Sequence, residues 1–532
     1  MMPSEGINLL MPSMLNSFRL GTVVSSLIFQ ICFQIPVLSF SIDGRKAPRY
    51  AESFVVYKVE QKLKKLIQNI KSRSRLVTLS EAIEQSLLKN PRLGASYKQL
   101  QQNEWNLIAV RRQWYPNFEF AQNNSYNILS NGVRNYNKQI PFKTLKSTST
   151  ALPTKISNLN TLTPSIKLSW TFFDPSRSPN INSSIEELRA SELLFNVEAR
   201  RIVLEAQLAF FVLQEQQQLI KNYQTILNST SDQVAITIAN FNAGNSDIAA
   251  VEQIRTQQLQ NLNLLISTYN NLAIASANLA DIISADPGAF VLAAGEIALV
   301  GEWKMSLNET IMQAERMREE VQVSLAQSSS LNWTATAIKN SYYPKLKIDV
   351  SGTYVNLNTE YENGFPDRDT SIGTISSKEK PSSSEQTTWD NRVALGLTWK
   401  IFDGGINTAQ AQAKQYAAQA LLEQAASNRL TIAKEVETAY AQYESSKLAL
   451  LTTEELVKSA SNALLSVRAR FNNGFSDMTS VVQATSRSID ASREHAKSKR
   501  NYNDAVASLY RFSAQWPDDA LPALSKRVQN LK

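Results

Sequence analysis

Three short motifs occur twice in this chain, in the same order and at nearly the same separation. They are Tyr115-Pro116, Trp170 to Asp174, and Phe241 to Asp247, which return as Tyr343-Pro344, Trp399 to Asp403, and Phe471 to Asp477 after 228, 229 and 230 residues. Three matches with so small a drift indicate a tandem duplication. We assign the repeats to residues 78–286 and 307–516, with a linker over 287–306 and a C-terminal tail over 517–532.

The chain before the first repeat divides into two parts. Arg19, the apolar run over 20–40 and the small residues around Phe40 are typical of a secretory signal. We predict a cleavable signal peptide over 1–41; because the run is long, a retained anchor helix is the alternative. Residues 42–77 form a basic extension.

This extension has ten Lys or Arg and three acidic residues between Asp43 and Arg75. The spacing of Val59, Leu63, Leu66 and Ile70 suggests an amphipathic helix within it. Such a segment is either a solvated leader or is attracted to an anionic envelope surface. Because the rest of the chain is close to neutral, we expect no nucleic-acid partner.

The sequence offers little for catalysis. Cys32 is the single cysteine and lies inside the apolar run, so the cleaved chain would have no thiol. His495 is the single histidine, in a polar helical stretch, and we interpret it as a solvated surface residue. We therefore expect no enzyme activity, no catalytic residues, no cofactor and no metal site.

Each repeat contains a pair of alternating apolar and polar segments, which we predict to be β-strands. They cover about residues 117–128 and 165–173, then about 345–356 and 392–402. The polar segments 130–163 and 359–390 read as external loops, so each pair is typical of an outer-membrane hairpin. The aromatic residues expected at the membrane interface are Trp170, Phe172, Trp399 and Phe402.

Helices account for the rest of each repeat. The segment 78–114 is helical with a break at Pro91, and 176–240 and 404–470 are long segments rich in Ala, Gln, Leu and Glu. At a rise of ~1.5 Å per residue, the latter would be roughly 100 Å long. Gly244 and Gly474 would then reverse the chain into a returning helix.

Four membrane strands cannot close a barrel alone, because open sheet edges in lipid leave backbone groups unpaired. The fold class expected is therefore mainly α with β, in two tandem repeats. Three chains would share a 12-stranded β-barrel that continues into a long α-helical barrel.

The Tyr-Pro pair before a strand, the strand end Trp-x-x-Phe-Asp and the turn Arg470-Phe471-x-x-Gly474 resemble the signatures of the TolC family of outer membrane efflux proteins, or outer membrane factors. The resemblance covers about residues 78–516. It implies a homotrimer in the outer membrane that extends into the periplasm. It further implies export of small molecules or proteins by efflux or type I secretion, with a periplasmic adaptor and an inner-membrane pump of the ABC or RND type.

By the same resemblance, the two glycine turns would close the periplasmic end and contact the adaptor. The corresponding positions are Phe241, Gly244, Asn245 and Asp247 in the first repeat, and Arg470, Phe471, Gly474, Phe475, Asp477, Ser480 and Gln483 in the second. Ser480 and Gln483 stand where the family often has an acidic ring, so the gate chemistry departs from the family pattern. Alternatively, these residues only cap helices, with Asp247 and Asp477 as N-caps.

Two other functions stay open. A non-channel coiled-coil scaffold of the envelope would explain the long helices but not the alternating hairpins. A hydrolase that uses carboxylates alone could draw on Asp367 and Asp369, but these lie in a polar loop without a calcium-loop spacing.

Overall fold

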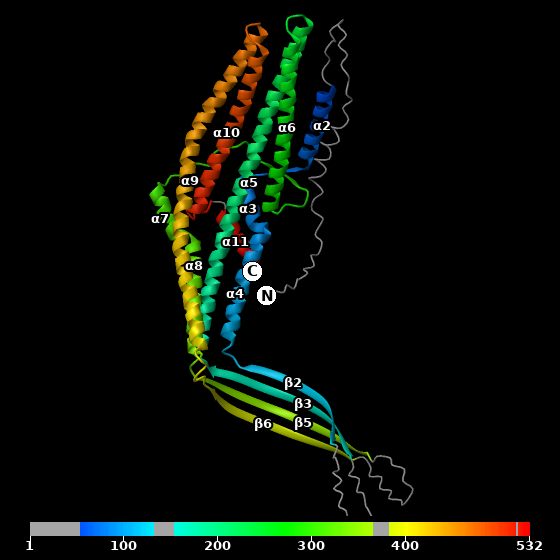
Figure 1. Cartoon of the computed structure of the whole chain (residues 1–532), viewed down its shortest axis with the longest axis vertical. Coiled ribbons are helices and arrows are strands. Elements are labelled where there is room, and N and C mark those ends of the chain that lie inside the picture. The colour runs from blue at the N-terminus through cyan, green and yellow to red at the C-terminus, as the bar shows by residue number, and fades with distance from the viewer. Residues whose placement is uncertain (1–53, 132–153, 365–381, 518–519, 532) are drawn as a thin grey trace, which may run out of the picture. The chain divides into compact units, whose positions relative to one another are not determined.

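The computed structural model describes residues 54–131, 154–364, 382–517 and 520–531. The expected signal peptide, Asp367 and Asp369 lie outside the described residues. Figure 1 shows a four-stranded sheet at one end of the described chain and helices extending away from it. No helix among the described residues is both long enough and apolar enough to span a membrane.

The two repeats have the same succession of elements. The first consists of α3 (Leu79–Lys89), α4 (Pro91–Arg112), β2 (Asn117–Asn131), β3 (Thr154–Phe173), α5 (Arg177–Asn242) and α6 (Ile248–Ile282). The second consists of α7 (Leu307–Met317), α8 (Glu319–Asn340), β5 (Lys345–Gly364), β6 (Ser382–Thr398), α9 (Ile406–Asn472) and α10 (Met478–Phe512). The prediction of a duplicated, mainly helical chain is confirmed.

Each repeat begins with the same local structure. The Thr78 and Ser306 side chains accept from Glu81 N and Glu309 N, and each glutamate carboxylate accepts in return from the capping residue's backbone N–H. Such a capping box satisfies two otherwise unpaired donors of the first turn. It therefore sets where each repeat's first helix begins.

The first two helices of each repeat are separated by one extended residue, Asn90 in the first repeat and Arg318 in the second. Their ψ values are 124° and 129°, where a helix needs about −42°. The Asn90 side chain accepts from Arg92 N and donates to the Ile282 carbonyl. Pro91, at the first position of α4, favours this break because it has no N–H to continue α3.

Charged side chains stabilise the break at Arg318, unlike the uncharged amide at Asn90, and we call this break the ionic joint. The Arg318 guanidinium donates to Glu320 on α8 and to Glu435 on α9, and Glu320 also accepts from Arg511 on α10 at 2.8 Å. Although burial would raise the pKa of Glu320, the two arginines lower it to about 2. The same backbone bend is therefore stabilised by charge in one repeat and by an amide in the other.

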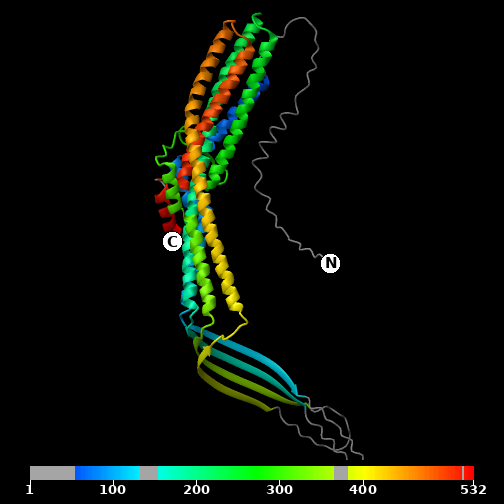
Figure 2. The ribbon, with the colours of Figure 1, turned by 60° about the vertical axis from the view of Figure 1, so that its left-hand side comes forward.

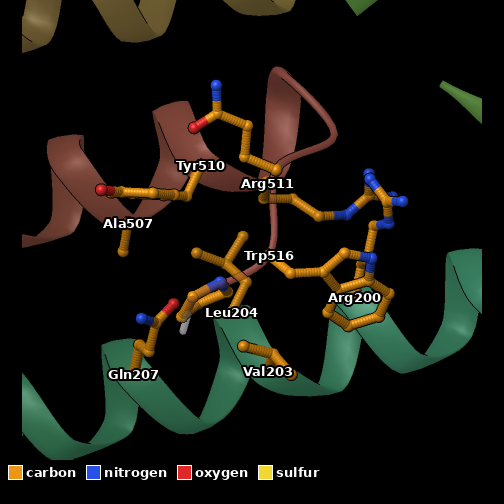
Figure 3. Close-up of a pocket in the computed structure, with 10 residues that line it drawn as sticks. Arg200, Val203, Leu204, Gln207, Ala507, Tyr510, Arg511 and Trp516 are labelled. Carbon is orange, nitrogen blue, oxygen red and sulfur yellow. The ribbon is translucent and has the colours of Figure 1, made fainter. Parts of the chain in front are cut away.

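A small cavity lies beside the ionic joint, between α5 and the end of α10 (Figure 3). The Trp516 ring covers the Arg200 guanidinium, with 4.7 Å between the ring centre and the guanidinium carbon. The volume is about 10 Å³, which is room for about one water molecule. This cavity is too small to bind an exported molecule.

The sheet is antiparallel throughout, in the order β2-β3-β5-β6. Pairing between β3 and β5 joins the hairpins of the two repeats, and β2 and β6 are left as edge strands. The four strands contain 15, 20, 20 and 17 residues. Such lengths exceed the 9–11 residues that a tilted strand needs to cross a bilayer.

The prediction of two long polar loops was wrong in its boundaries. Thr154–Thr163 belongs to β3, Thr359–Gly364 to β5 and Ser382–Asp390 to β6, whereas β6 ends at Thr398 instead of 402. Most of these strand ends lack a regular alternation of apolar and polar side chains and are stabilised by backbone pairing, so hydrophobic alternation did not reveal them. The loop segments 132–153 and 365–381 lie outside the described residues.

The long helices form two antiparallel hairpins, α5 with α6 and α9 with α10 (Figures 1 and 2). The 66 residues of α5 extend roughly 100 Å, at ~1.5 Å per residue. Along α9, a seam of apolar residues at steps of three and four is partly or fully buried: Val457, Ala460, Leu464, Val467 and Phe471. Near the turns, a cluster around Val234, Ile254 and Val481 packs the two hairpins together.

Short elements outside the repeats complete the middle of the molecule. The basic extension contains α2 (Phe54–Arg73) and β1 (Ser74–Val77), and β1 pairs in parallel with β4 (Phe290–Ala293) of the linker. Helix α11 (Ala520–Leu531) of the tail packs against α3 through Ala520 and Ala523. Within α2, Leu66 is 45% exposed and Ile67 packs inward, so the predicted apolar stripe was wrong by one position.

Candidate functional site

One face of the sheet is an exposed apolar surface. Its side chains belong to alternate positions of all four strands: Phe118, Phe120, Ile166, Val350, Val393, Leu395 and Leu397. Val393 and Leu395 are 77% and 73% exposed. Large apolar side chains so exposed on one sheet face are typical of contact with lipid.

Aromatic side chains lie at both ends of this apolar surface. Trp170 and Trp399 lie at the end next to the helices, where Trp170 packs against Phe172 with 5.9 Å between ring centres. Tyr354 and Trp389 lie at the other end and pack with 4.8 Å between ring centres. Two aromatic rows with apolar residues between them match the girdles of a membrane barrel wall.

The opposite face of the sheet is polar. Glu119, Lys167, Ser351 and Arg392 are direct cross-strand neighbours, so they form one row across all four strands. In the neighbouring row, Ser169 Oγ donates to Asp349 Oδ1 at 2.6 Å. A sheet with one apolar and one charged face separates lipid from water.

The junction between sheet and helices is held by the same hydrogen bond in both repeats. The indole N–H of Trp170 donates to the Trp114 carbonyl at 2.9 Å, and that of Trp399 donates to the Tyr342 carbonyl at 3.0 Å. Each tryptophan thus joins the end of a return strand to the residue just before the Tyr-Pro motif. In addition, the Arg177 guanidinium lies over the Trp114 ring at 4.5 Å.

The aspartate of each Phe-Asp motif fixes the next helix start. Asp174 accepts from the backbone and hydroxyl of Ser176 and from Lys345 Nζ, the last at 2.9 Å. Burial opposes ionisation of Asp174, but these hydrogen bonds outweigh it and lower its pKa. Asp403 accepts from Tyr342 Oη and from the backbone N–H of Gly405 and Asn407. The motif therefore positions the long helix on the sheet.

The two turns at the far ends of the hairpins have the same geometry. Gly244 and Gly474 have φ values of +79° and +78°. Asn245 N donates to the Asn240 carbonyl and Phe475 N donates to the Arg470 carbonyl, each at 2.8 Å. This is the Schellman motif, which calls for a left-handed residue and hence glycine.

The acidic residues after the turns are N-caps. Asp247 accepts from Ala250 N at 2.8 Å, and Asp477 accepts from Ser480 N at 3.0 Å and from the Ser480 hydroxyl. These hydrogen bonds lower the pKa of Asp477. Asp247 and Asp477 therefore cap the helices that follow the turns. Ser480, which stands where an acidic ring was expected, donates its hydroxyl to Asp477 and so supports this cap.

Other predicted turn residues are exposed or half-buried. Phe475 is 75% exposed, and Asn245 and Gln483 are also exposed. Phe241 is half-buried, and Phe471 packs against the cluster that joins the hairpins. The Arg470 guanidinium donates to the Phe475 carbonyl at 3.4 Å, within its own turn.

Two contacts that the sequence did not reveal join α5 to α9 near the turns. The Arg468 guanidinium donates to Ser229 Oγ, and Gln233 Nε2 donates to Asn472 Oδ1 at 3.2 Å. Burial lowers the pKa of Arg468, partly offset by Asp232. These residues follow no local pattern, since each pair is far apart in the chain.

A groove of about 460 Å³ lies between α6 and α10 just beyond the turns. Its lining comes from both repeats and includes Glu252, Gln253 and Thr256 of α6 with Thr479 and Val482 of α10. The groove is open and is lined by both polar and apolar side chains, so it is not an enclosed ligand site.

His495 was wrongly predicted to be solvated. It is half-buried on α10, with Nδ1 3.3 Å from the Thr453 hydroxyl of α9. Burial and the nearby Lys499 lower its pKa. Among the described residues, no group of three or more His, Cys, Asp or Glu side chains could hold a metal ion.

Comparison with known proteins gives one family and a shared fold. The family described as outer membrane efflux protein matches residues 82–285 and 310–515, one match for each repeat. No curated protein matches the chain.

Three solved structures similar to this chain are outer-membrane proteins. The CmeC outer membrane channel of Campylobacter jejuni has 14% identity and a TM-score of 0.64 over 85% of this chain and 89% of its own. The outer membrane protein VceC of Vibrio cholerae has 12% identity and a TM-score of 0.60 over 82% of this chain and 96% of its own. The MtrE outer membrane channel of Neisseria gonorrhoeae has 15% identity and a TM-score of 0.58 over 82% of this chain and 89% of its own. Such low identities show the fold alone.

Proposed function

The chain belongs to the outer membrane efflux protein family, and we propose on that premise that three copies join their four-stranded sheets into one 12-stranded channel. As a member of the family, the protein is an outer-membrane efflux channel.

The free edges of β2 and β6 carry the proposal of a shared barrel. Within the described part of the chain, both strands pair on one side only. Both also present large apolar side chains, Phe118 and Phe120 on β2 and Leu395 and Leu397 on β6. Unpaired backbone groups beside such side chains are prohibitive in lipid. Pairing of β6 with β2 of the next copy removes both edges.

In this arrangement the polar face of the sheet lines the pore. The row of Glu119, Lys167, Ser351 and Arg392 would be repeated by each copy around the lumen. The aromatic residues Trp170, Phe172, Trp399 and Phe402 would lie at the periplasmic interface, and Tyr354 and Trp389 at the outer one. The long helices would continue the conduit into the periplasm.

The hairpin turns form the proposed periplasmic gate and adaptor surface. The gate consists of the contacts between the hairpins, Arg468 with Ser229 and Gln233 with Asn472, together with the packing of Phe471. The exposed turn residues and the groove between α6 and α10 would receive helices of a periplasmic adaptor, which couples the channel to an inner-membrane pump of the ABC or RND type.

Export to the outer membrane requires a signal, and residues 1–41 are the proposed cleavable one. The mature chain then begins near the basic extension. We assign no catalytic role to any residue, since the described polar clusters serve as caps, joints and pore lining. The cargo would be small molecules or proteins taken from the periplasm or directly from the pump.

Purified protein in mild detergent tests the proposal. We expect a mass of three chains and ion-conducting channels in planar bilayers, with protein retained in the membrane after carbonate wash. A stable monomer without conductance, released by salt or carbonate, would instead indicate an envelope scaffold.

A further inference from the structure

Helix α2 of the basic extension has one apolar face that packs on the body of the protein. Val56 is buried, and Val59, Leu63 and Ile67 pack against the cluster that includes Leu265 of α6 and Leu219 of α5. This contact sets the rotation of α2 about its axis. The opposite face of the helix is therefore held outward.

The outward face of α2 is basic. Lys62, Lys65 and Arg73 are exposed and lie within about 80° of one another around the axis, at 3.6 residues per turn. Lys64 is exposed on one flank. None of these four side chains forms an ion pair with another described residue, unlike Arg75, which lies 3.8 Å from Glu81. We call Lys62, Lys64, Lys65 and Arg73 the α2 basic face.

The α2 basic face lies far from the four-stranded sheet. Both views place α2 beside α6, with α3 and α4 between it and the sheet (Figures 1 and 2). The 22 residues of α4 alone extend about 33 Å. This is several times the Debye length of about 8 Å at physiological salt, so lipid phosphates around the sheet cannot attract these charges.

We propose that the α2 basic face binds the carboxylate groups of peptidoglycan around the helical part of the channel. The inference rests on the proposed function, which places these helices in the periplasm. Lysine ammonium groups are compact charges without a fixed binding geometry, so they suit separate carboxylates along a flexible polymer better than one planar anion. Several such charges on one rigid helix bind a repeating polyanion together.

Co-sedimentation of the purified full-length channel with peptidoglycan sacculi tests the proposal. We expect binding to intact sacculi at low salt, loss of binding in 0.5 M NaCl, and loss after the sacculus carboxylates have been amidated. The variant Lys62→Glu/Lys65→Glu should bind at least about tenfold more weakly. The control Lys414→Glu/Lys458→Glu makes the same charge change at exposed positions of α9 and should bind as the unmodified protein does.

Planar-bilayer conductance measured on the same preparations separates this inference from the channel proposal. Normal conductance with equal sedimentation of both double variants would overturn the peptidoglycan site and leave the channel intact. Preferential binding to vesicles of anionic phospholipid, or to an acidic protein with sacculi left unbound, would also overturn it. Loss of conductance in all preparations would count against the channel itself.

Discussion

The indole of Trp170 donates its N–H to the carbonyl of Trp114 at 2.9 Å and so joins the end of β3 to the chain just after α4. The second repeat contains the same bond from Trp399 to Tyr342. A typical intramolecular hydrogen bond contributes about 0.5–1.5 kcal/mol to the free energy of unfolding. The tryptophan common to both repeats thus fastens the end of a return strand to the chain that leaves the preceding helix.

Replacing this tryptophan by phenylalanine tests that role. Trp170→Phe keeps an aromatic ring but removes the donor, so we expect the unfolding free energy to fall by about 1 kcal/mol. Thermal unfolding followed by circular dichroism measures the change. Trp105→Phe on α4 is the control, since Trp105 is 62% exposed. Equal stability of the two variants would contradict the role of the bond.

The two faces of β6 should respond differently to charge. Leu395→Arg places a cation on the proposed lipid face, which costs about 2–4 kcal/mol near the bilayer centre. We therefore expect loss of protein from the outer membrane. Ala394→Arg, one position away on the polar face, should insert normally and alter conductance. Immunoblots of membrane fractions measure the insertion of both variants, and planar-bilayer recordings measure the conductance of Ala394→Arg. Equal insertion of the two variants would argue against the barrel.

The left-handed turn at Gly474 should tolerate only certain residues. The space around a Cβ atom is open there, so the cost of substitution comes from the φ of +78°. Gly474→Val should distort the turn and impair export, whereas Gly474→Asn should retain it because Asn adopts this conformation at lower cost. Drug tolerance of complemented cells measures export. Full tolerance in the valine variant would count against a role of this turn.

The contact between Arg468 and Ser229 should hold the hairpin ends together. Arg468→Ala/Asn472→Ala removes both hydrogen bonds between α5 and α9, so we expect larger and longer channel openings in planar bilayers. Lys458→Ala, an exposed change on α9, should leave the openings as they are. If the double variant conducts like the control, the gate lies elsewhere.

Asp504 should make stability depend on pH near neutrality. Burial raises the pKa of Asp504 to about 7, and Arg500, 3.5 Å away, only partly offsets this. The folded state therefore holds this proton more tightly than the unfolded chain does, and stability falls as pH rises from about 4 through 7. Asp504→Asn should raise the melting temperature more at pH 8 than at pH 4.

The control for this effect is Glu104→Gln, because Glu104 is exposed on α4. It should shift the melting temperature equally little at both pH values. If Asp504→Asn behaves in the same way as the control, Asp504 is ionised in the folded protein near neutral pH.

The alternation of apolar and polar side chains predicted the part of the sheet next to the helices but not where its strands end at the loops. Leu395 and Leu397 alternate with small or polar residues. The same alternation, continued toward the N-terminus, reaches Trp389, so Trp389 could have shown that β6 begins before residue 392. Thr154–Thr163 has no such alternation, although its backbone pairs with β2 and β5. The sequence therefore predicted the part of each hairpin that has exposed apolar side chains and underestimated the length of the hairpin.

Local sequence patterns could not predict pairings between segments that lie far apart in the chain. The four-residue strands β1 and β4 are too short to show a period, and Ser74 pairs with Phe290 across the whole first repeat. The turns, by contrast, were predictable, because Gly244 and Gly474 each stand at the end of an unbroken helical pattern and are followed by a capping aspartate. Contacts such as Arg468 with Ser229 depend on how two hairpins pack, which no single segment encodes.

The unlike chemistry of the breaks at Asn90 and Arg318 means that the two halves of the duplicated chain depend on different groups for the same backbone bend. The amide bonds of Asn90 involve no ionised group, whereas the bonds of Arg318 need the carboxylate form of Glu320. Because the pKa of Glu320 is about 2 and salt screens buried ion pairs weakly, the second bend stays ionic in any ordinary medium. After the duplication, the bend was kept while the chemistry that stabilises it diverged.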